Sequence, residues 1–141
     1  GFHVDQWHHG LMAGTQARRA NAADHMVLTA LVHDLAKVLS IEGHPETIAA
    51  KLKPYVPAEA YHVVRTHQDF QGRHYYLFLG RSPTLRDKYK SEAWFALAEQ
   101  FTDQWDQTAF DPAYAVDTFE SFEPLIDQFF AKPMWTPPAF C

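Results

Sequence analysis

The stretch Met26-Val-Leu-Thr-Ala-Leu-Val-His33-Asp34-Leu-Ala-Lys37-Val-Leu39 decides the fold prediction for this chain. Apolar residues occupy nearly every helical position in it rather than one stripe, and a helix of this kind is buried on all sides. His33 and Asp34 are adjacent near its carboxyl end, which places an imidazole and a carboxylate about 100° apart around the helix axis. Both side chains can therefore reach one ion, or two neighbouring ions, inside the core.

Helical spacing rather than two-residue alternation marks the rest of the chain. We expect a first helix from Val4 to Ala20, and Asp24 as N-cap of the buried helix. A short third helix is expected to begin at Pro45, and a fourth at Pro57 and Glu59. Ser91 is expected to cap a fifth helix, and a last helix begins near Pro124 within residues 119–130. Residues 68–90 are predicted to be irregular, and their basic cluster (Arg81, Arg86, Lys88, Lys90) favours a solvated connection over a substrate loop. The prediction is an all-α protein, with residues 1–141 forming a single helical bundle of about five or six helices.

Composition limits the classes of partner. The chain has 141 residues, 47% of them hydrophobic, and 12 Lys and Arg against 17 Asp and Glu give a net charge of −5. Without a basic run there is no electrostatic footprint for nucleic acid or an anionic membrane. No apolar run approaches the roughly 18 residues of a transmembrane helix. The only cysteine is Cys141, so no intrachain disulfide can form and we expect a reducing, cytoplasmic location.

Several ionisable residues fall on segments that also read as core helix. Burying them is costly unless something binds them. Imidazole and carboxylate ligands without thiolate suit iron, manganese or zinc. The candidate ligands are His9, His33, Asp34, His44, His67 and Asp106. Six ligands exceed the four of one tetrahedral zinc, so two metal ions bridged by Asp34 would use them all.

Periodicity supports some of these candidates and leaves others open. His67 follows Val63 and Val64 at helical spacing and is expected to face the core, unlike His62. His8 and His9 are not separated by their weak helical stripe. Asp103 and Asp106 both lie on a polar face of the fifth helix, with Asp106 nearer the apolar stripe.

The order and spacing of these residues resemble those of the HD-domain superfamily, most closely its diiron oxygenase branch, which includes inositol oxygenases and phosphonate-cleaving oxygenases. The segments His9–Ala20 and Leu31–Leu39 resemble the inositol enzymes. Glu42-Gly-His44 and Thr66-His67 are more similar to the phosphonate enzymes. The resemblance covers about residues 4–110, implies an HD-type bundle with a dinuclear centre, and selects His9 and Asp106 as ligands.

The function implied by the resemblance is that of a mixed-valent diiron oxygenase (Fe²⁺/Fe³⁺). Such an enzyme uses O₂ to cleave a C–C or C–P bond in a small hydroxylated or phosphonate substrate, with Asp34 at the metals and Lys37 binding the substrate. By helical spacing, Lys37 lies one turn from Asp34 and could hold an anion or extend to water. Ala36 stands where the family usually has glycine. Gln68 and Phe110 stand where inositol enzymes carry serine and lysine, which argues against inositol.

An alternative within the same superfamily is a metal-dependent phosphohydrolase that acts on a phosphate ester or nucleotide. Such an enzyme would use manganese, zinc or magnesium to activate water and polarise a phosphoryl oxygen. The additional pair His44 and His67 favours the oxygenase, because it completes a six-ligand set.

Overall fold

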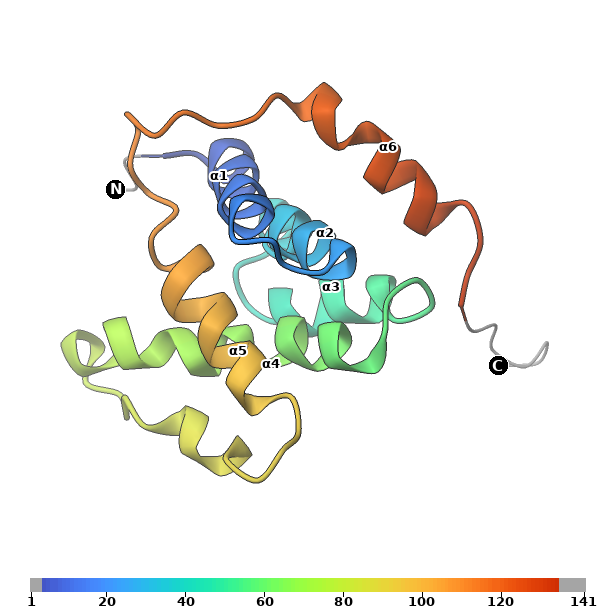
Figure 1. Cartoon of the computed structure of the whole chain (residues 1–141). Coiled ribbons are helices and arrows are strands. Elements are labelled where there is room, and N and C mark those ends of the chain that lie inside the picture. The colour runs from blue at the N-terminus through green and yellow to red at the C-terminus, as the bar shows by residue number, and fades with distance from the viewer. Residues whose placement is uncertain (1–3, 135–141) are drawn as a thin grey trace.

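The structure, a computed structural model, describes residues 4–134, and these residues form helices and connections without any β-strand. The six α-helices are α1 (Gln6–Arg19), α2 (Asp24–Val32), α3 (His44–Leu52), α4 (Ala58–Tyr75), α5 (Phe95–Gln100) and α6 (Phe119–Phe130) (Figure 1). Between them lie three 3₁₀-helices, η1 (Leu35–Val38), η2 (Tyr76–Leu79) and η3 (Leu85–Tyr89), and a π-helix, η4 (Phe101–Asp106). The predicted all-α class with five or six helices is confirmed for these residues.

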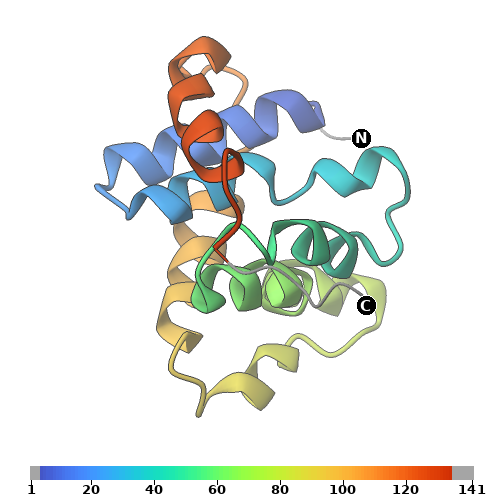
Figure 2. The ribbon, with the colours of Figure 1, turned by 90° about the vertical axis from the view of Figure 1, so that its right-hand side faces the viewer.

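The helices pack in pairs around one hydrophobic core. α1 packs along α2, and α3 packs along α4 beneath them, while α6 crosses above α1 and α2 (Figures 1 and 2). α5 and η4 form one continuous rod that contacts both α1 and α4. Met12, Leu28, Val64, Phe101 and Phe122 are fully buried where these elements meet. The core therefore holds together segments that lie far apart in the sequence.

The predicted buried helix is shorter than expected. α2 ends at Val32, His33 is its C-cap, and Asp34 leaves the helical conformation with φ −107° and ψ 6° before η1 begins. Val38 and Leu39 are exposed rather than buried. The prediction of one helix through Leu39 is wrong, because a run that is apolar at every position defines no face and so carries no signal for its end.

The segment 68–90 is also more ordered than predicted. α4 continues to Tyr75, since Phe70 is fully buried and Gly72 makes room for the ring of Tyr76. The prediction of an irregular segment fails because these two anchors are surrounded by polar residues that mask the helical stripe. Arg86, assigned to a solvated cluster, is 2% exposed.

Three helix starts differ from their predicted positions. Asp24 is the first residue of α2 rather than its cap, and α5 begins at Phe95, well after Ser91. α6 begins at Phe119, where the hydroxyl of Thr118 accepts a hydrogen bond from the Ser121 amide. Pro124, predicted to open this helix, lies inside it.

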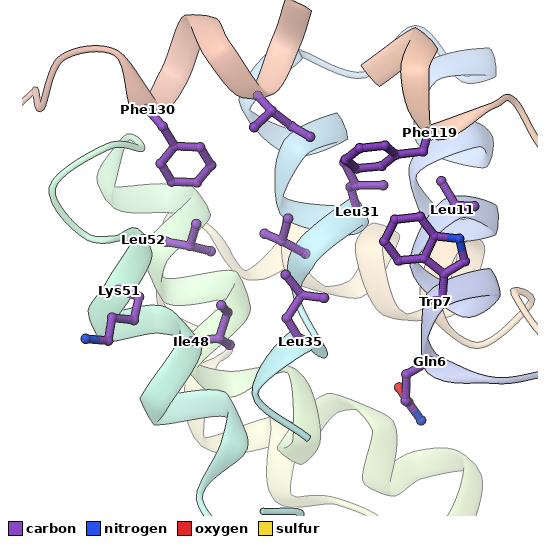
Figure 3. A pocket seen from close by; sticks show the side chains of 12 residues that line it. Gln6, Trp7, Leu11, Leu31, Leu35, Ile48, Lys51, Leu52, Phe119 and Phe130 are labelled. Atoms are coloured by element: carbon purple, nitrogen blue, oxygen red, sulfur yellow. The ribbon is translucent and has the colours of Figure 1, made fainter. Parts of the chain in front are cut away.

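An apolar cavity of about 350 Å³ lies between α6 and the first three helices. Figure 3 shows Phe130 and Leu52 on one side and Phe119 and Trp7 on the other, with Leu31 between them. The end of α2 separates this cavity from the histidines, because Leu31, Val32 and Leu35 line it whereas His33 and Asp34 do not.

Two predictions from composition concern a membrane-spanning helix and the single cysteine. Within residues 4–134, no helix combines the length and apolar character that crossing a bilayer requires. Cys141, on which the expected reducing location depends, lies outside the described residues.

Candidate metal centre

Five helical elements bring the six predicted ligands to one point in the core. His9 comes from the first half of α1, and His33 and Asp34 from the end of α2. His44 is the first residue of α3, His67 lies in the middle of α4, and Asp106 is the last residue of η4. All six side chains are buried. The structure therefore brings together every residue of the predicted set.

The first group consists of His9, His33, Asp34 and Asp106. Nε2 of His9 lies 2.9 Å from Oδ1 of Asp106 and 3.3 Å from Oδ2 of Asp34. Nε2 of His33 lies 3.1 Å and 3.2 Å from the same two oxygens. Two nitrogens and two carboxylate oxygens thus converge on a common centre.

The second group consists of Asp34, His44 and His67. Oδ1 of Asp34 lies 3.1 Å from Nε2 of His44 and 3.1 Å from Nε2 of His67. Since Oδ2 of the same carboxylate belongs to the first group, Asp34 spans both groups. The two groups share this residue and form one double cluster.

The outer hydrogen bonds of the histidines fix which ring nitrogen carries hydrogen. Nδ1 of His33 lies 2.7 Å from the carbonyl oxygen of Ala30, and Nδ1 of His44 lies 2.7 Å from that of Ile41. Nδ1 of His67 lies 2.6 Å from the carbonyl oxygen of Val64, and Nδ1 of His9 lies 2.9 Å from that of Ala109. A carbonyl only accepts, so each Nδ1 must donate, and in a neutral ring Nε2 is then a bare acceptor.

These bare acceptors face one another. Nε2 of His9 lies 3.2 Å from Nε2 of His33, and Nε2 of His44 lies 3.1 Å from Nε2 of His67, with carboxylate oxygens closing each group. Such a cage of lone pairs needs positive charge at its centre, supplied either by protons or by metal ions. Metal ions fit better, because the backbone bonds are those that orient metal-binding imidazoles.

The electrostatics of the cluster agree with this demand for positive charge. Burial would raise the pKa of Asp34 and of Asp106, yet the neighbouring charge of His33 and hydrogen bonds from the histidines hold both values far below the usual range. Burial would lower the pKa of His9 and of His33, but the two carboxylates raise both. The site therefore stabilises cations and ionised carboxylates together.

The structure separates the two ambiguous pairs. His8 is exposed and bonds only to Asp5 at the start of α1, whereas His9 points into the cluster. Asp103 binds Arg86 and His74, whereas Asp106 joins the first group. In each pair, the residue favoured by the resemblance is the one in the cluster.

The π-helix explains why periodicity did not separate the two aspartates. In an α-helix, residues three apart lie only about 60° apart around the axis. η4 has the wider π turn, with the Gln107 amide bonded to the Thr102 carbonyl at 2.8 Å, and this turns Asp103 and Asp106 further apart. A π turn of this kind leaves no signature in the spacing of apolar residues.

Arg86 is the main residue whose role the sequence did not reveal. Its guanidinium donates to the carbonyl of Phe70 at 2.6 Å, to both carboxylate oxygens of Asp103 at 3.0 and 3.1 Å, and to Glu99 at 3.2 Å. It thus ties η3 to α4 and to the helix that carries Asp106. The only signal available was an arginine among other basic residues, which is usually solvated.

A cavity of about 350 Å³ opens beside the second group. Asp34, His44 and His67 lie in its lining, together with Lys37, whose Nζ is 3.3 Å from Oδ2 of Asp34. Gln71 and Tyr75 also line it. The ring of Phe110 stacks on His9 with centroids 4.4 Å apart and closes the cavity on that side.

Comparison with known proteins adds no assignment: no protein-family model matches the chain, and no curated protein matches it. The geometry alone establishes that buried histidines and aspartates of this chain form two adjoining groups that could hold metal ions.

Proposed function

We propose that this chain is an HD-domain enzyme in which two iron ions and O₂ oxidise a small hydroxylated substrate and cleave its adjacent C–C or C–P bond. The observation that carries the proposal is the Asp34 carboxylate, whose two oxygens lie in different histidine groups. A mononuclear centre has no use for a carboxylate shared in this way. Two ions, one in each group, would use every donor in the cluster.

The protein residues have distinct roles in this proposal. His9, His33 and Asp106 would hold one ion and His44 and His67 the other. Iron would supply the one-electron chemistry with O₂ that no side chain provides. The second group has only three protein donors, and all three line the cavity, whereas both histidines of the first group do not; this favours the second group as the place where a substrate hydroxyl binds. Lys37 would hold an anionic group of the substrate beside Asp34.

Phosphate-ester hydrolysis on the same centre is the rival activity. Recognition of a phosphate ester typically uses several arginine and lysine donors. In the described lining of the cavity, Lys37 is the one cationic side chain, and the remaining wall is largely apolar. This lining supports a substrate with one anionic group and an apolar remainder rather than a nucleotide, and therefore favours the oxygenase.

Metal stoichiometry tests the dinuclear centre. The protein would be loaded anaerobically with Fe(II), and the bound iron measured by elemental analysis and electron paramagnetic resonance. We expect two ions in the native protein and loss of the second in His67→Ala, whose affinity should fall at least about 10–100-fold. His62→Ala is the matched control, because His62 lies on the same helix, stacks on Trp94 and is outside both groups. A single ion in the native protein contradicts the proposal.

Oxygen uptake distinguishes the two activities. The iron form should consume O₂ with a hydroxylated substrate, and zinc substitution should abolish this turnover because zinc has no redox chemistry. Efficient hydrolysis of phosphate esters by the zinc or manganese form, without oxygen uptake across a broad panel of alcohols, would replace the oxygenase with its rival.

A further inference from the structure

The cavity beside the second histidine group has mostly apolar walls, which is unusual next to a cluster of charged ligands. Its walls include Ile41 from the segment before α3, Tyr75 from α4, and Phe78 and Leu79 from η2. We call these four residues the apolar wall. They come from two separate parts of the chain, so the apolar character of the cavity does not result from a single hydrophobic helix.

The apolar wall is exposed to solvent although its side chains are large. Ile41, Phe78 and Leu79 are all more than half exposed, and Tyr75 is partly so. Most of the large hydrophobic side chains that the described residues expose lie in these same two segments, 38–41 and 75–79. In Figure 2 the two segments lie toward the same edge of the molecule. Exposed apolar surface concentrated at the opening of a pocket is typical of a binding site.

Besides the candidate ligands, three polar side chains interrupt the apolar lining: Lys37, Gln68 and Gln71. Lys37 offers one positive charge next to Asp34. The amide oxygen of Gln71 is shielded from solvent, so it is not offered to a ligand in the cavity. The lining therefore fits one anionic group at the metal end.

We infer that the substrate class of this site is a compact hydroxylated organic anion with an aromatic or branched aliphatic body. The hydroxyl and the anionic group would face the metal ions and Lys37. The apolar body would lie against the apolar wall and remove it from water. A polyol has no apolar body to cover this wall, which would stay exposed to water, and is therefore disfavoured. The inference rests on the proposed metal centre, but it concerns binding and does not depend on the reaction.

Titration calorimetry on the zinc-loaded protein tests the inference without turnover. Three ligands would be compared: phenyllactate, lactate, which lacks the apolar body, and phenylpropionate, which lacks the hydroxyl. Phenyllactate should bind roughly ten-fold more tightly than either, because burial of the ring and metal-end contacts both contribute. Lactate or phenylpropionate binding as tightly as phenyllactate, or no binding of phenyllactate, overturns the inference.

A matched pair of variants tests the place of the apolar body. Leu79→Ser removes a residue of the apolar wall and should weaken phenyllactate roughly five-fold while leaving lactate unchanged. Leu77→Ser is the control, because Leu77 lies on the same 3₁₀-helix and is similarly exposed, 71% against 65%, but does not line the cavity. Equal losses in the two variants overturn the inference.

Two further measurements keep the outcomes distinct. Zinc content is determined first, so a protein that takes up no zinc refutes the metal centre, whereas a loaded protein with the wrong ligand preference refutes only the substrate class. Sedimentation is measured for both variants. If Leu79→Ser dissociates a dimer of the native protein, the apolar wall is a contact between two copies and the inference is overturned.

Discussion

Replacement of Gly10 by alanine tests how closely α1 and α2 pack beside the candidate metal ligands. A Cβ at this position would lie 2.5 Å from the carbonyl oxygen of Leu31. An ordinary carbon–oxygen contact is about 3.3 Å or longer. The two helices must therefore separate by roughly 0.8 Å, because the obstructing atom belongs to the backbone and cannot rotate away.

The net effect on stability combines two opposing terms. Forced overpacking costs about 3 kcal/mol at the upper end of its range, which applies here because backbone atoms clash. Alanine gains about 1 kcal/mol over glycine inside a helix. The expected loss is about 2 kcal/mol, or a decrease in Tm of roughly 6 °C for a chain of this size. Urea denaturation and thermal melting of the metal-free protein measure both quantities.

The same substitution should weaken metal binding, because His9 adjoins Gly10. A metal site tolerates errors in ligand distance of only about 0.2 Å. Displacement of α1 by several times that amount should reduce metal affinity by roughly ten-fold or more, as measured by competition with a chelator.

Gly14→Ala is the matched control on the same face of α1. Its Cβ would meet Leu31 and Phe122 at 3.4 Å, an ordinary contact, so helix propensity should dominate and raise stability by up to about 1 kcal/mol. The two alanines are thus expected to change Tm in opposite directions. If Gly10→Ala is as stable as Gly14→Ala and binds metal as well as the native protein, the close packing of α1 on α2 described here is wrong.

Three further predictions concern the supports of the site. Arg86→Met should cost about 2–3 kcal/mol in urea denaturation, because it removes both arginine hydrogen bonds to Asp103 and the side-chain donor of the Phe70 carbonyl; a loss below about 0.5 kcal/mol contradicts the network. Burial opposes ionisation of Asp103, but hydrogen bonds from Arg86 and His74 lower its pKa below 3.8, so its stabilisation is present above that pH and is lost as the pH falls through the lowered value. Asp103→Asn should therefore melt with a shallower loss of Tm on acidification, and an unchanged slope argues against this contribution. Thr118→Ala should cost about 1 kcal/mol through loss of the N-cap of α6, whereas Thr118→Ser should cost much less; equal melting of the two variants contradicts the cap.

The sequence predicted the elements whose apolar residues repeat at helical spacing. α1 begins two residues later and ends one residue earlier than expected, and His67 was placed on the core side of its helix by Val63 and Val64. A repeated stripe identifies both a helix and its buried face, so it also identifies a histidine on that face. The gathering of all six candidate residues needed more than periodicity, and the prediction of the full set came from a resemblance in spacing.

The features that the sequence missed are those that depend on tertiary partners. Arg86 is buried because Asp103, Glu99 and the Phe70 carbonyl surround it, and none of these is near it in the sequence. The end of α2 at Val32 and the π turn of η4 both aim a carboxylate into the cluster. Local propensity carries no signal for such distortions, because the interactions that stabilise them are made by distant residues.

The outer hydrogen bonds show which ligand depends most on the fold. His33, His44 and His67 each donate to a carbonyl three residues earlier, so the local backbone alone orients these three rings. His9 instead donates to Ala109, one hundred residues away. Its orientation requires that α1 and the segment after η4 dock correctly at the same time. Three imidazoles are thus oriented by their own local backbone, and closure of the first group is coupled to global packing through His9. Changes that loosen α1, such as Gly10→Ala, should therefore impair the first group before the second.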